Sequence, residues 1–434
     1  MALGGGTFLT QNKILPGSYI NIISVTKATA TLSDRGYCTM PLELDWGVDG
    51  DVFTVETADF QKDSLKIFGY DYTSSKLKGL RDLFLNANTL YAYRLNSGEK
   101  ATNEFATAKY TGIRGNDLSI VIQNNVDDET LFDVETYIDN TTLLDLQTVD
   151  SFDKLIDNDF VIWKNATLTL TSGTPLTGGT NGTVTGTKHQ EYLSKIEKYT
   201  FNILGVICED SIINKLYASF TKRLRDEVGM KFQAVLFNTA FDYEGVINVK
   251  NEVLDVGENK ASLVYWVTGL EASCLVNKSC LNKIYNGEFT VYADYTQTQL
   301  INCIKKGEFA LHMVNDTVRV LMDINSMVTE TTEKGSIFKE NQTMRVADQI
   351  ANDTAVIFNT KYLGICPNDK EGRIALWSDI AKHREELQKI RAIQDFSDKD
   401  ITVEQGDDKN AVVVSETISV VNAMAKLYMT TRIY

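Results

Sequence analysis

The sequence predicts an α/β protein of several domains, with a β-rich domain inserted into an α/β core and strand-forming arms at both ends. The length of 434 residues corresponds to about three domains of roughly 150 residues each. Apolar residues follow strand and helix periods in turn through residues 188–340, which indicates parallel strands joined by helices. Residues 101–187 keep the strand pattern alone and carry thirteen acidic against four basic side chains, which separates them from the core.

The composition excludes several classes of protein. The chain has 43 basic and 58 acidic residues and a net charge of −15, so it lacks the excess of Lys and Arg on which nucleic-acid binding depends. No run approaches the ~20 apolar residues of a membrane helix, and the first residues lack the pattern of a signal peptide. We therefore expect a soluble protein made in the cytoplasm, with no membrane insertion. Its six scattered cysteines form no Cys-x-x-Cys pair, which predicts free thiols in or near cores.

The N-terminal hundred residues predict an arm followed by strands. In residues 1–26, an uncharged β-branched strand follows a Pro-Gly-Ser turn, and its members are Tyr19, Ile20, Ile22, Ile23 and Val25. Residues 27–100 predict the N-terminal part of the core, with strands at 35–41, 51–55 and 90–95 and a short helix at 77–85. The inserted domain, residues 101–187, predicts strands at 118–122 and 166–171 and ends in a Gly-rich segment, 177–186. Within it, the backbone of residues 178–182 is a candidate for phosphate binding, but a flexible linker is the favoured interpretation.

Residues 188–340 predict a βαβ unit and further strands. The apolar segments 201–208 and 232–237 flank a helix that begins at Asp210 or Ser211 and ends at Gly229. Further strands are predicted near residues 263–266, 289–292 and 318–322. In residues 341–434 two helical patterns, 344–358 and 374–393, precede a hairpin at 401–414 and a final run that alternates like a strand.

A search for catalytic and binding motifs returns one weak candidate. Nucleotide-binding loops, His-Glu-x-x-His and Gly-x-Ser-x-Gly are absent, and His383 lies in a charged run that favours a solvated helix face. Glu209 and Asp210 follow a predicted parallel strand, where α/β sheets place ligands, so they are candidates for a divalent metal. The competing interpretation is favoured: Asp210 caps the helix that follows. We predict no catalytic residue, cofactor or metal.

Two strand-forming arms without partners are an aggregation hazard unless they pair with another strand. Pairing with neighbouring subunits and pairing within the same subunit are equally consistent with the composition.

Five blocks, in order along nearly the whole chain, resemble the tail sheath proteins of contractile phage tails and phage-tail-like bacteriocins, or tailocins. They are Pro16-Gly17-Ser18-Tyr19-Ile20, the segment from Asp34-Arg35-Gly36 to Asp45-Trp46-Gly47, residues 108–117, residues 176–182 and residues 420–430. The resemblance implies a subtilisin-like domain without protease residues at 188–340, a β-sandwich at 101–187 and an α+β C-terminal sheath domain at 341–434.

The resemblance also implies that both arms add strands to the C-terminal sheet of neighbouring subunits, which builds stacked rings into a helical sheath around a tail tube. The arm residues are then those at 19–25 already named together with Leu427, Tyr428, Met429 and Ile433. The acceptor hairpin carries Ile401, Val403, Val412 and Val414. Baseplate and tail terminator proteins are further implied partners, and the implied location is a virion or a phage-tail-like particle assembled in the bacterial cytoplasm.

The function expected from this resemblance is a structural one. A sheath subunit polymerises in a metastable extended state and contracts to drive the tube through the target cell envelope. A partly basic helix face with Lys382, Arg384, Lys389 and Arg391 is a candidate contact to an acidic tube, and a merely solvated face is equally consistent. The alternatives are a metal-dependent enzyme acting at Glu209 and Asp210, and a non-contractile tail or capsid protein.

Overall fold

A computed structural model describes residues 32–434, so the predicted strand at residues 19–25 lies outside the described part. The described residues fall into two units. The large unit comprises residues 34–352, 391–394 and 420–434, and the small unit comprises residues 32–33, 353–390 and 395–419. None of the described helices is both long and apolar enough to cross a membrane.

A seven-stranded sheet forms the centre of the large unit, in the order β13-β12-β11-β10-β1-β3-β2. All neighbours are parallel except β2, which runs antiparallel to β3. Its central strands are buried on both faces, as their continuous apolar runs predict. The strands are β1 (Tyr37–Leu42), β2 (Val52–Glu56), β3 (Thr89–Arg94), β10 (Ile203–Val206), β11 (Gln233–Phe237), β12 (Val246–Val249) and β13 (Glu308–Phe309). The predicted α/β class and the parallel β10–β11 pair are confirmed.

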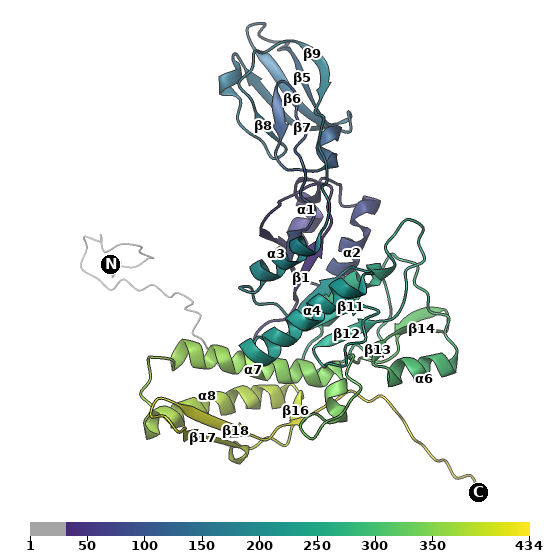
Figure 1. Cartoon of the computed structure of the whole chain (residues 1–434), viewed down its shortest axis with the longest axis vertical. Helices are drawn as coiled ribbons and strands as arrows, with labels where there is room; N and C mark the ends of the chain where they lie inside the picture. Colours follow the sequence, from purple (N-terminus) through teal and green to yellow (C-terminus); the bar gives the residue numbers. More distant parts are fainter. Residues whose placement is uncertain (1–31) are drawn as a thin grey trace, which may run out of the picture. The chain divides into compact units, whose positions relative to one another are not determined.

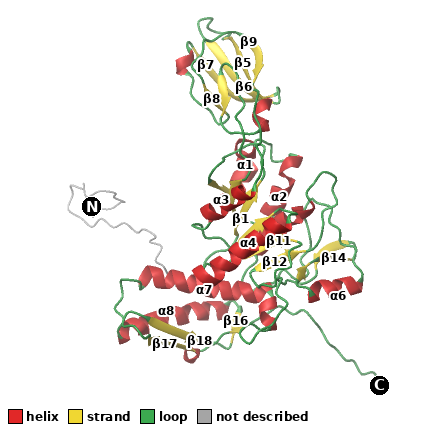
Figure 2. Cartoon of the chain, viewed as in Figure 1, coloured by secondary structure: helices red, strands yellow, loops and turns green. Residues whose placement is uncertain are grey.

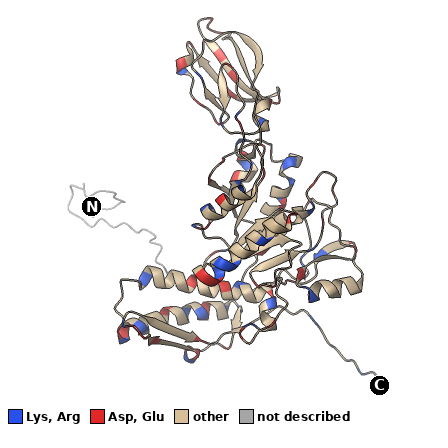
Figure 3. Cartoon of the chain, viewed as in Figure 1, with Lys and Arg blue, Asp and Glu red and all other residues tan. Residues whose placement is uncertain are grey.

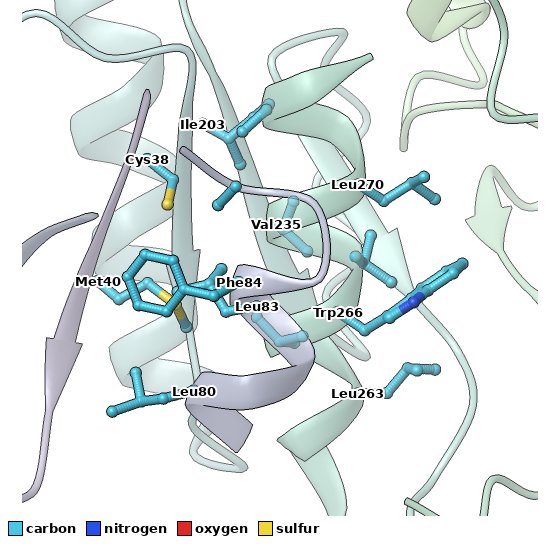
Figure 4. Packing of buried hydrophobic residues seen from close by; sticks show 14 of the residues in the cluster. Cys38, Met40, Leu80, Leu83, Phe84, Ile203, Val235, Leu263, Trp266 and Leu270 are labelled. Atoms are coloured by element: carbon cyan, nitrogen blue, oxygen red, sulfur yellow. The ribbon is translucent and has the colours of Figure 1, made fainter. Parts of the chain in front are cut away.

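Helices of the large unit pack around this sheet (Figure 1). They are α1 (Thr57–Phe68), α2 (Lys78–Phe84), α3 (Gly186–Ile196), α4 (Ser211–Arg223), α5 (Leu263–Ser273), α6 (Gln297–Lys305) and the first part of α7 (Asn341–Lys361). Figure 4 shows the core in which side chains of α2 and α5 meet those of β1, β10 and β11. Gly229 ends the helical run after α4 in a left-handed conformation, as predicted.

Two predicted strands of the large unit are wrong. Residues 263–266 are helical because α5 is apolar on nearly every side and buried, and a buried helix has the same apolar run as a buried strand. Residues 289–292 form a loop that carries one isolated bridge, Val253 to Val291. The strand predicted near 318–322 is found as β15 (Thr317–Val320), which pairs with β14 (Leu311–Val314).

The inserted segment forms a β-sandwich, part of the large unit. Its four-stranded sheet has the order β7-β6-β5-β9 and its two-stranded sheet pairs β4 with β8 (Figure 1). The strands are β4 (Ala106–Ala108), β5 (Leu118–Asn124), β6 (Phe132–Ile138), β7 (Thr142–Val149), β8 (Val161–Trp163) and β9 (Thr171–Pro175). The strand predicted at 166–171 is displaced, because the register with β5 begins only at Thr171.

The Gly-rich segment after the sandwich is fastened rather than free, contrary to the prediction of a flexible linker. The Thr180 amide donates to the Glu99 carbonyl (3.1 Å), and Asn116 brackets the backbone of Gly179 with two hydrogen bonds of 2.8 and 3.0 Å. A Cβ at Gly179 would lie 2.4 Å from the Gly112 carbonyl oxygen, so the close approach requires glycine.

The small unit contains the last part of α7, the helix α8 (Lys370–Lys389) and a hairpin of β17 (Ile401–Gln405) and β18 (Val412–Glu416) (Figure 2). Both predicted helices and the predicted hairpin are confirmed. Of two further short strands, β16 (Ile393–Gln394) belongs to the large unit, and β19 (Ser419–Val420) lies where the chain passes from the small unit to the large one. A small core joins α8 to the hairpin through Leu376, Ile380 and Ile401.

Candidate assembly interface

The C-terminal arm, residues 424–434, has no helix or strand and is exposed along its length. Leu427, Met429 and Ile433, which occupy alternate positions of an extended chain, are 86%, 79% and 92% exposed. Figure 2 draws this run as a loop that ends at the C-terminus. The expected strand pattern is therefore present in the sequence, whereas none of the described residues supplies a ladder for it. A row of exposed apolar side chains of this kind is typical of a binding segment.

The root of this arm is anchored within the large unit. The Gln342 side chain, in the first turn of α7, donates to the Val421 carbonyl (3.1 Å) and accepts from the Ala423 amide (2.9 Å). Asn422 donates to the Glu340 carboxylate at 2.6 Å. The side-chain amide of Gln342 thus pairs with the backbone as a neighbouring strand does. From residue 424 onward, no described hydrogen bond holds the chain.

The predicted acceptor hairpin packs on one face only. Ile401, Val403 and Val412 contact the core of the small unit, whereas Val413 on the opposite face is 52% exposed; Val414, which pairs with Val403 on the packed face, is 38% exposed. Five residue pairs, from Ile401–Glu416 to Gln405–Val412, hold the two strands in antiparallel register. Among the described residues β17 and β18 pair only with each other, so each strand keeps one open edge.

A groove borders the open edge of β17. It has a volume of about 520 Å³ and is lined on one side by β17 and on the other by α8, with Ile374, Trp377 and the stems of Lys370 and Arg373. The Trp377 indole donates to the Ile401 carbonyl at 3.2 Å, which fixes the ring beside the strand. An unpaired edge next to an apolar wall is the arrangement that β-strand addition uses, because the backbone supplies hydrogen bonds and the wall receives alternate side chains.

Arg384 and His383 are buried in the small unit, which corrects two predictions. Arg384 is 1% exposed and forms a bidentate ion pair with Glu416 at the end of β18 (2.9 and 3.0 Å). It also donates to His383 Nδ1 (2.7 Å), whose Nε2 bonds the Asp353 carboxylate (2.7 Å). His383 therefore does not lie on a solvated face, and Arg384 has no surface to offer a partner. Its physical role is to fasten the acceptor hairpin to α8.

The start of the described chain is tied to the same cluster. The Ser33 hydroxyl donates to Asp353, and the Ser33 amide donates to the other carboxylate oxygen at 3.4 Å. Ser33 follows the segment that contains the predicted N-terminal arm residues, which lie outside the described part of the chain. The buried polar cluster thus anchors the chain at this point.

The remaining predicted contact residues are exposed. Lys382 and Lys389 lie on the outer side of α8, and Arg391 follows the helix in a left-handed conformation with φ +63°. Figure 3 shows Lys and Arg segments along α8, interleaved with acidic ones. Lys389 lies 3.5 Å from Glu386, so part of the basic charge is already balanced.

Asp210 caps α4, as the favoured interpretation predicted. Its carboxylate accepts from the Ile212 amide at 2.7 Å, and Glu209 accepts from the Lys260 amide at 3.3 Å. Both carboxylates therefore serve as acceptors for backbone amides, which is a structural role.

A buried charge cluster in the large unit had no signal in the sequence. Arg345 of α7 pairs with Glu271 (2.5 Å) and Asp323 (2.6 Å), and all three side chains are at most 3% exposed. Burial raises the pKa of Glu271 well above its usual value. Burial also opposes ionisation of Asp323, but the positive charge of Arg345 outweighs this effect and holds the pKa of Asp323 below its usual value. Glu271, Asp323 and the Cys280 thiol lie within 4.8 Å of one another. The guanidinium supplies the positive charge that a metal ion would otherwise bring to these carboxylates.

Four family models match consecutive parts of the chain. They are described as "Tail sheath protein Gp18 domain III N-terminal region" (residues 35–95), "Phage tail sheath protein beta-sandwich domain" (96–181), "Phage tail sheath protein central domain" (182–326) and "Phage tail sheath C-terminal domain" (333–434). The chain is also 31% identical to the phage-like element PBSX protein XkdK of Bacillus subtilis, over 98% of this chain and 99% of that protein.

Solved structures show the same similarity. The sheath tail protein from Desulfitobacterium hafniense has a TM-score of 0.83 and 37% identity, over 95% of this chain and 99% of that one. The sheath tail protein of Listeria innocua has a TM-score of 0.79 and 31% identity, over 91% and 93% of the two chains. The helical sheath of the anti-feeding prophage in its contracted state has a TM-score of 0.57 at 11% identity, over 97% and 99%, a likeness of fold alone.

Proposed function

This chain belongs to the phage tail sheath protein family, and from that premise we propose that it is the subunit of a contractile sheath whose assembly depends on strands exchanged between subunits. The observation that carries the proposal is the exposed, alternating C-terminal arm together with a hairpin whose edges are open. In this proposal, an arm of one subunit adds to the hairpin of a neighbour, and the N-terminal residues 19–25 do the same at another neighbour.

Three features of the described residues support strand exchange. The arm residues Leu427, Met429 and Ile433 are apolar on one face and have no contacts of their own to lose. The groove along β17 provides an apolar wall beside an open edge. The hairpin is held by the buried Arg384–Glu416 pair, so it presents its edges without needing the added strand to fold. Main-chain hydrogen bonds of an added strand persist while globular surfaces rearrange, which is what a contracting lattice requires.

Deletion of residues 426–434 tests the proposal. Because the arm is exposed, the truncated protein should fold as the full chain does, with unchanged circular dichroism and thermal midpoint. It should form no sheath in negative-stain electron microscopy, with or without a tail tube. A matched control replaces the same nine residues with Gly and Ser, and this variant should fail equally. Normal sheaths from either variant would show that the arm does not link subunits.

We further propose that the sheath surrounds a tail tube, which contacts the exposed residues Lys382, Lys389 and Arg391. Their basic charge suits an acidic tube surface, and Arg384 takes no part because it is buried. The acidic sandwich is placed outside in this proposal, where its net negative charge keeps particles apart. Baseplate and tail terminator proteins are proposed to bind the two ends of the sheath, within a virion or a phage-tail-like particle assembled in the bacterial cytoplasm.

The family to which the chain belongs is a structural one, and we propose that the protein has no enzymatic activity. The energy for contraction would come from the difference in intersubunit free energy between two packings. The helix-capping role of Asp210 supports this proposal, since it accounts for the acidic pair without a reaction.

A further inference from the structure

Two cysteines at the end of α5 lie together beside the buried charge cluster of the large unit. Cys274 follows the last residue of α5, and Cys280 lies six residues later, at the other end of a short loop. The Cys274 sulfur lies 3.6 Å from the Lys278 carbonyl oxygen, two residues before Cys280, and each thiol shifts the pKa of the other. Cys280 is buried, whereas Cys274 is half-buried. A partly exposed thiol next to a buried one is the arrangement of an attacking and a resolving cysteine.

The loop between the cysteines is held in place by the charge cluster. Arg345 donates to the Lys278 carbonyl (3.0 Å), Arg35 donates to the Cys274 carbonyl (2.8 Å), and the Cys280 amide donates to Asp323 (2.9 Å). Both ends of the loop are therefore fixed, so the two sulfurs stay adjacent. No long-range movement is needed to join them.

The charges around Cys274 favour its thiolate. The neighbouring Cys280 thiol lowers the pKa of Cys274 to about 7. Burial opposes this shift, and the positive charge of Arg345 adds to it. Asp323 acts in the opposite direction, and Arg35 acts with Arg345. Burial raises the pKa of Cys280 well above its usual value, so one thiol of the pair ionises first.

We propose that Cys274 and Cys280 are a redox-active pair that closes to an intrachain disulfide on reaction with a low-molecular-weight disulfide. The Cys274 thiolate attacks one sulfur of the small disulfide, whose S–S bond breaks, and the released thiolate takes a proton from water. Cys280 then loses its proton and attacks the Cys274 sulfur of the mixed disulfide, releasing the second small thiol. Two protein thiols are oxidised and one small disulfide is reduced to two thiols. The disulfide closes the loop whose Lys278 carbonyl accepts a hydrogen bond from Arg345.

Oxidised glutathione added to the native full-length protein, under nitrogen at neutral pH, tests the pair. The intact mass should fall by about 2 Da, the two hydrogens lost, and non-reducing peptide mapping should join Cys274 to Cys280. The rate should rise with pH through about 7, as Cys274 ionises. Cys280→Ser should instead keep a glutathione adduct on Cys274, because the resolving thiol is missing. Cys208→Ser and Cys366→Ser, which change half-buried thiols elsewhere, should react as the wild type does.

Three results would overturn the proposal. A stable glutathione adduct on Cys274 in the wild type would show that Cys280 cannot resolve it. Linkage of either cysteine to another position would show a different pairing. Formation of the disulfide only after addition of denaturant would show that the folded protein holds the sulfurs apart. If Cys280→Ser does not fold, the wild-type mass and mapping experiment decides alone.

Discussion

The alternation of the C-terminal arm predicts that its two faces contribute unequally to assembly. Met429 lies on the apolar face with Leu427 and Ile433, and Thr430 lies on the opposite face. We expect Met429→Asp to impair sheath assembly strongly and Thr430→Asp to impair it weakly. Both residues belong to a segment that makes no packing contacts in the described fold, so neither change should alter the thermal midpoint of the monomer.

The expected size of the effect follows from exposure. Met429 is 79% exposed in the free subunit, and burial of such a side chain contributes about 2 kcal/mol. Loss of this term weakens each arm contact by a factor of about 30. Burial of a carboxylate in its place adds a further cost, so about 30-fold is the smallest expected increase in the protein concentration needed for assembly.

Sedimentation across a dilution series, with electron microscopy of the pellets, measures that concentration for the wild type and both variants. Equal assembly by Met429→Asp and wild type would refute the strand-exchange argument. Equal and severe defects in both variants would refute the assignment of faces, since it would show that the arm does not bind as a strand with one buried side.

Three other predictions concern the rest of the chain. Lys382→Glu combined with Lys389→Glu should reduce cosedimentation of the sheath with its tube by at least tenfold, and unchanged binding would remove α8 from the tube contact. Asp210→Ala should cost about 1 kcal/mol of stability through loss of the helix cap, whereas Asp210→Asn should cost little. Added Mg²⁺ should leave the thermal midpoint of each protein unchanged. Stabilisation by Mg²⁺ that Asp210→Asn abolishes would instead support a metal site. Burial raises the pKa of Asp82 to about 6, so between about pH 4 and pH 6 the folded state binds a proton that the unfolded state does not. This proton uptake stabilises the folded state at low pH by on the order of 3 kcal/mol, and the stabilisation is lost as the pH rises through about 6. Denaturant titrations should therefore show Asp82→Asn gaining stability relative to wild type between about pH 4 and pH 7, and a constant difference would contradict the buried-carboxyl argument.

The sequence predicted those elements whose pattern is local. The parallel strands β10 and β11, the helix cap at Asp210 and the hairpin β17–β18 each have a period, a cap or a turn that a short window contains. The apolar run of α5 misled the prediction because burial on all sides removes the helical period. Helix α1 was not predicted, and in the structure it is kinked at the non-helical Asp63.

The same limit applies to the residues proposed for the interface. Alternation predicts a strand in the C-terminal arm, which stays a prediction, whereas the burial of His383 and Arg384 depends on Asp353 and Glu416, which are 30 and 32 residues away from them. A charged run in a helix favours solvent unless such partners are known. The Cys274–Cys280 pair was not predicted because its spacing matches no motif, and Arg345, which adds to the effect of Cys280 on the pKa of Cys274, lies 65 or more residues further along the chain.

The fastened Gly-rich segment has a consequence for how such chains change over evolutionary time. The two ends of the sandwich lie side by side where the chain leaves and re-enters the core. The Glu99 amide donates to the Thr180 hydroxyl, and the Thr180 amide donates to the Glu99 carbonyl. A module whose two ends meet in this way can be lost, enlarged or exchanged at the gene level without stretching the core. The sandwich can therefore diversify while the sheet and the C-terminal hairpin stay under separate constraint. The same junction is the natural place to graft a foreign domain onto the protein.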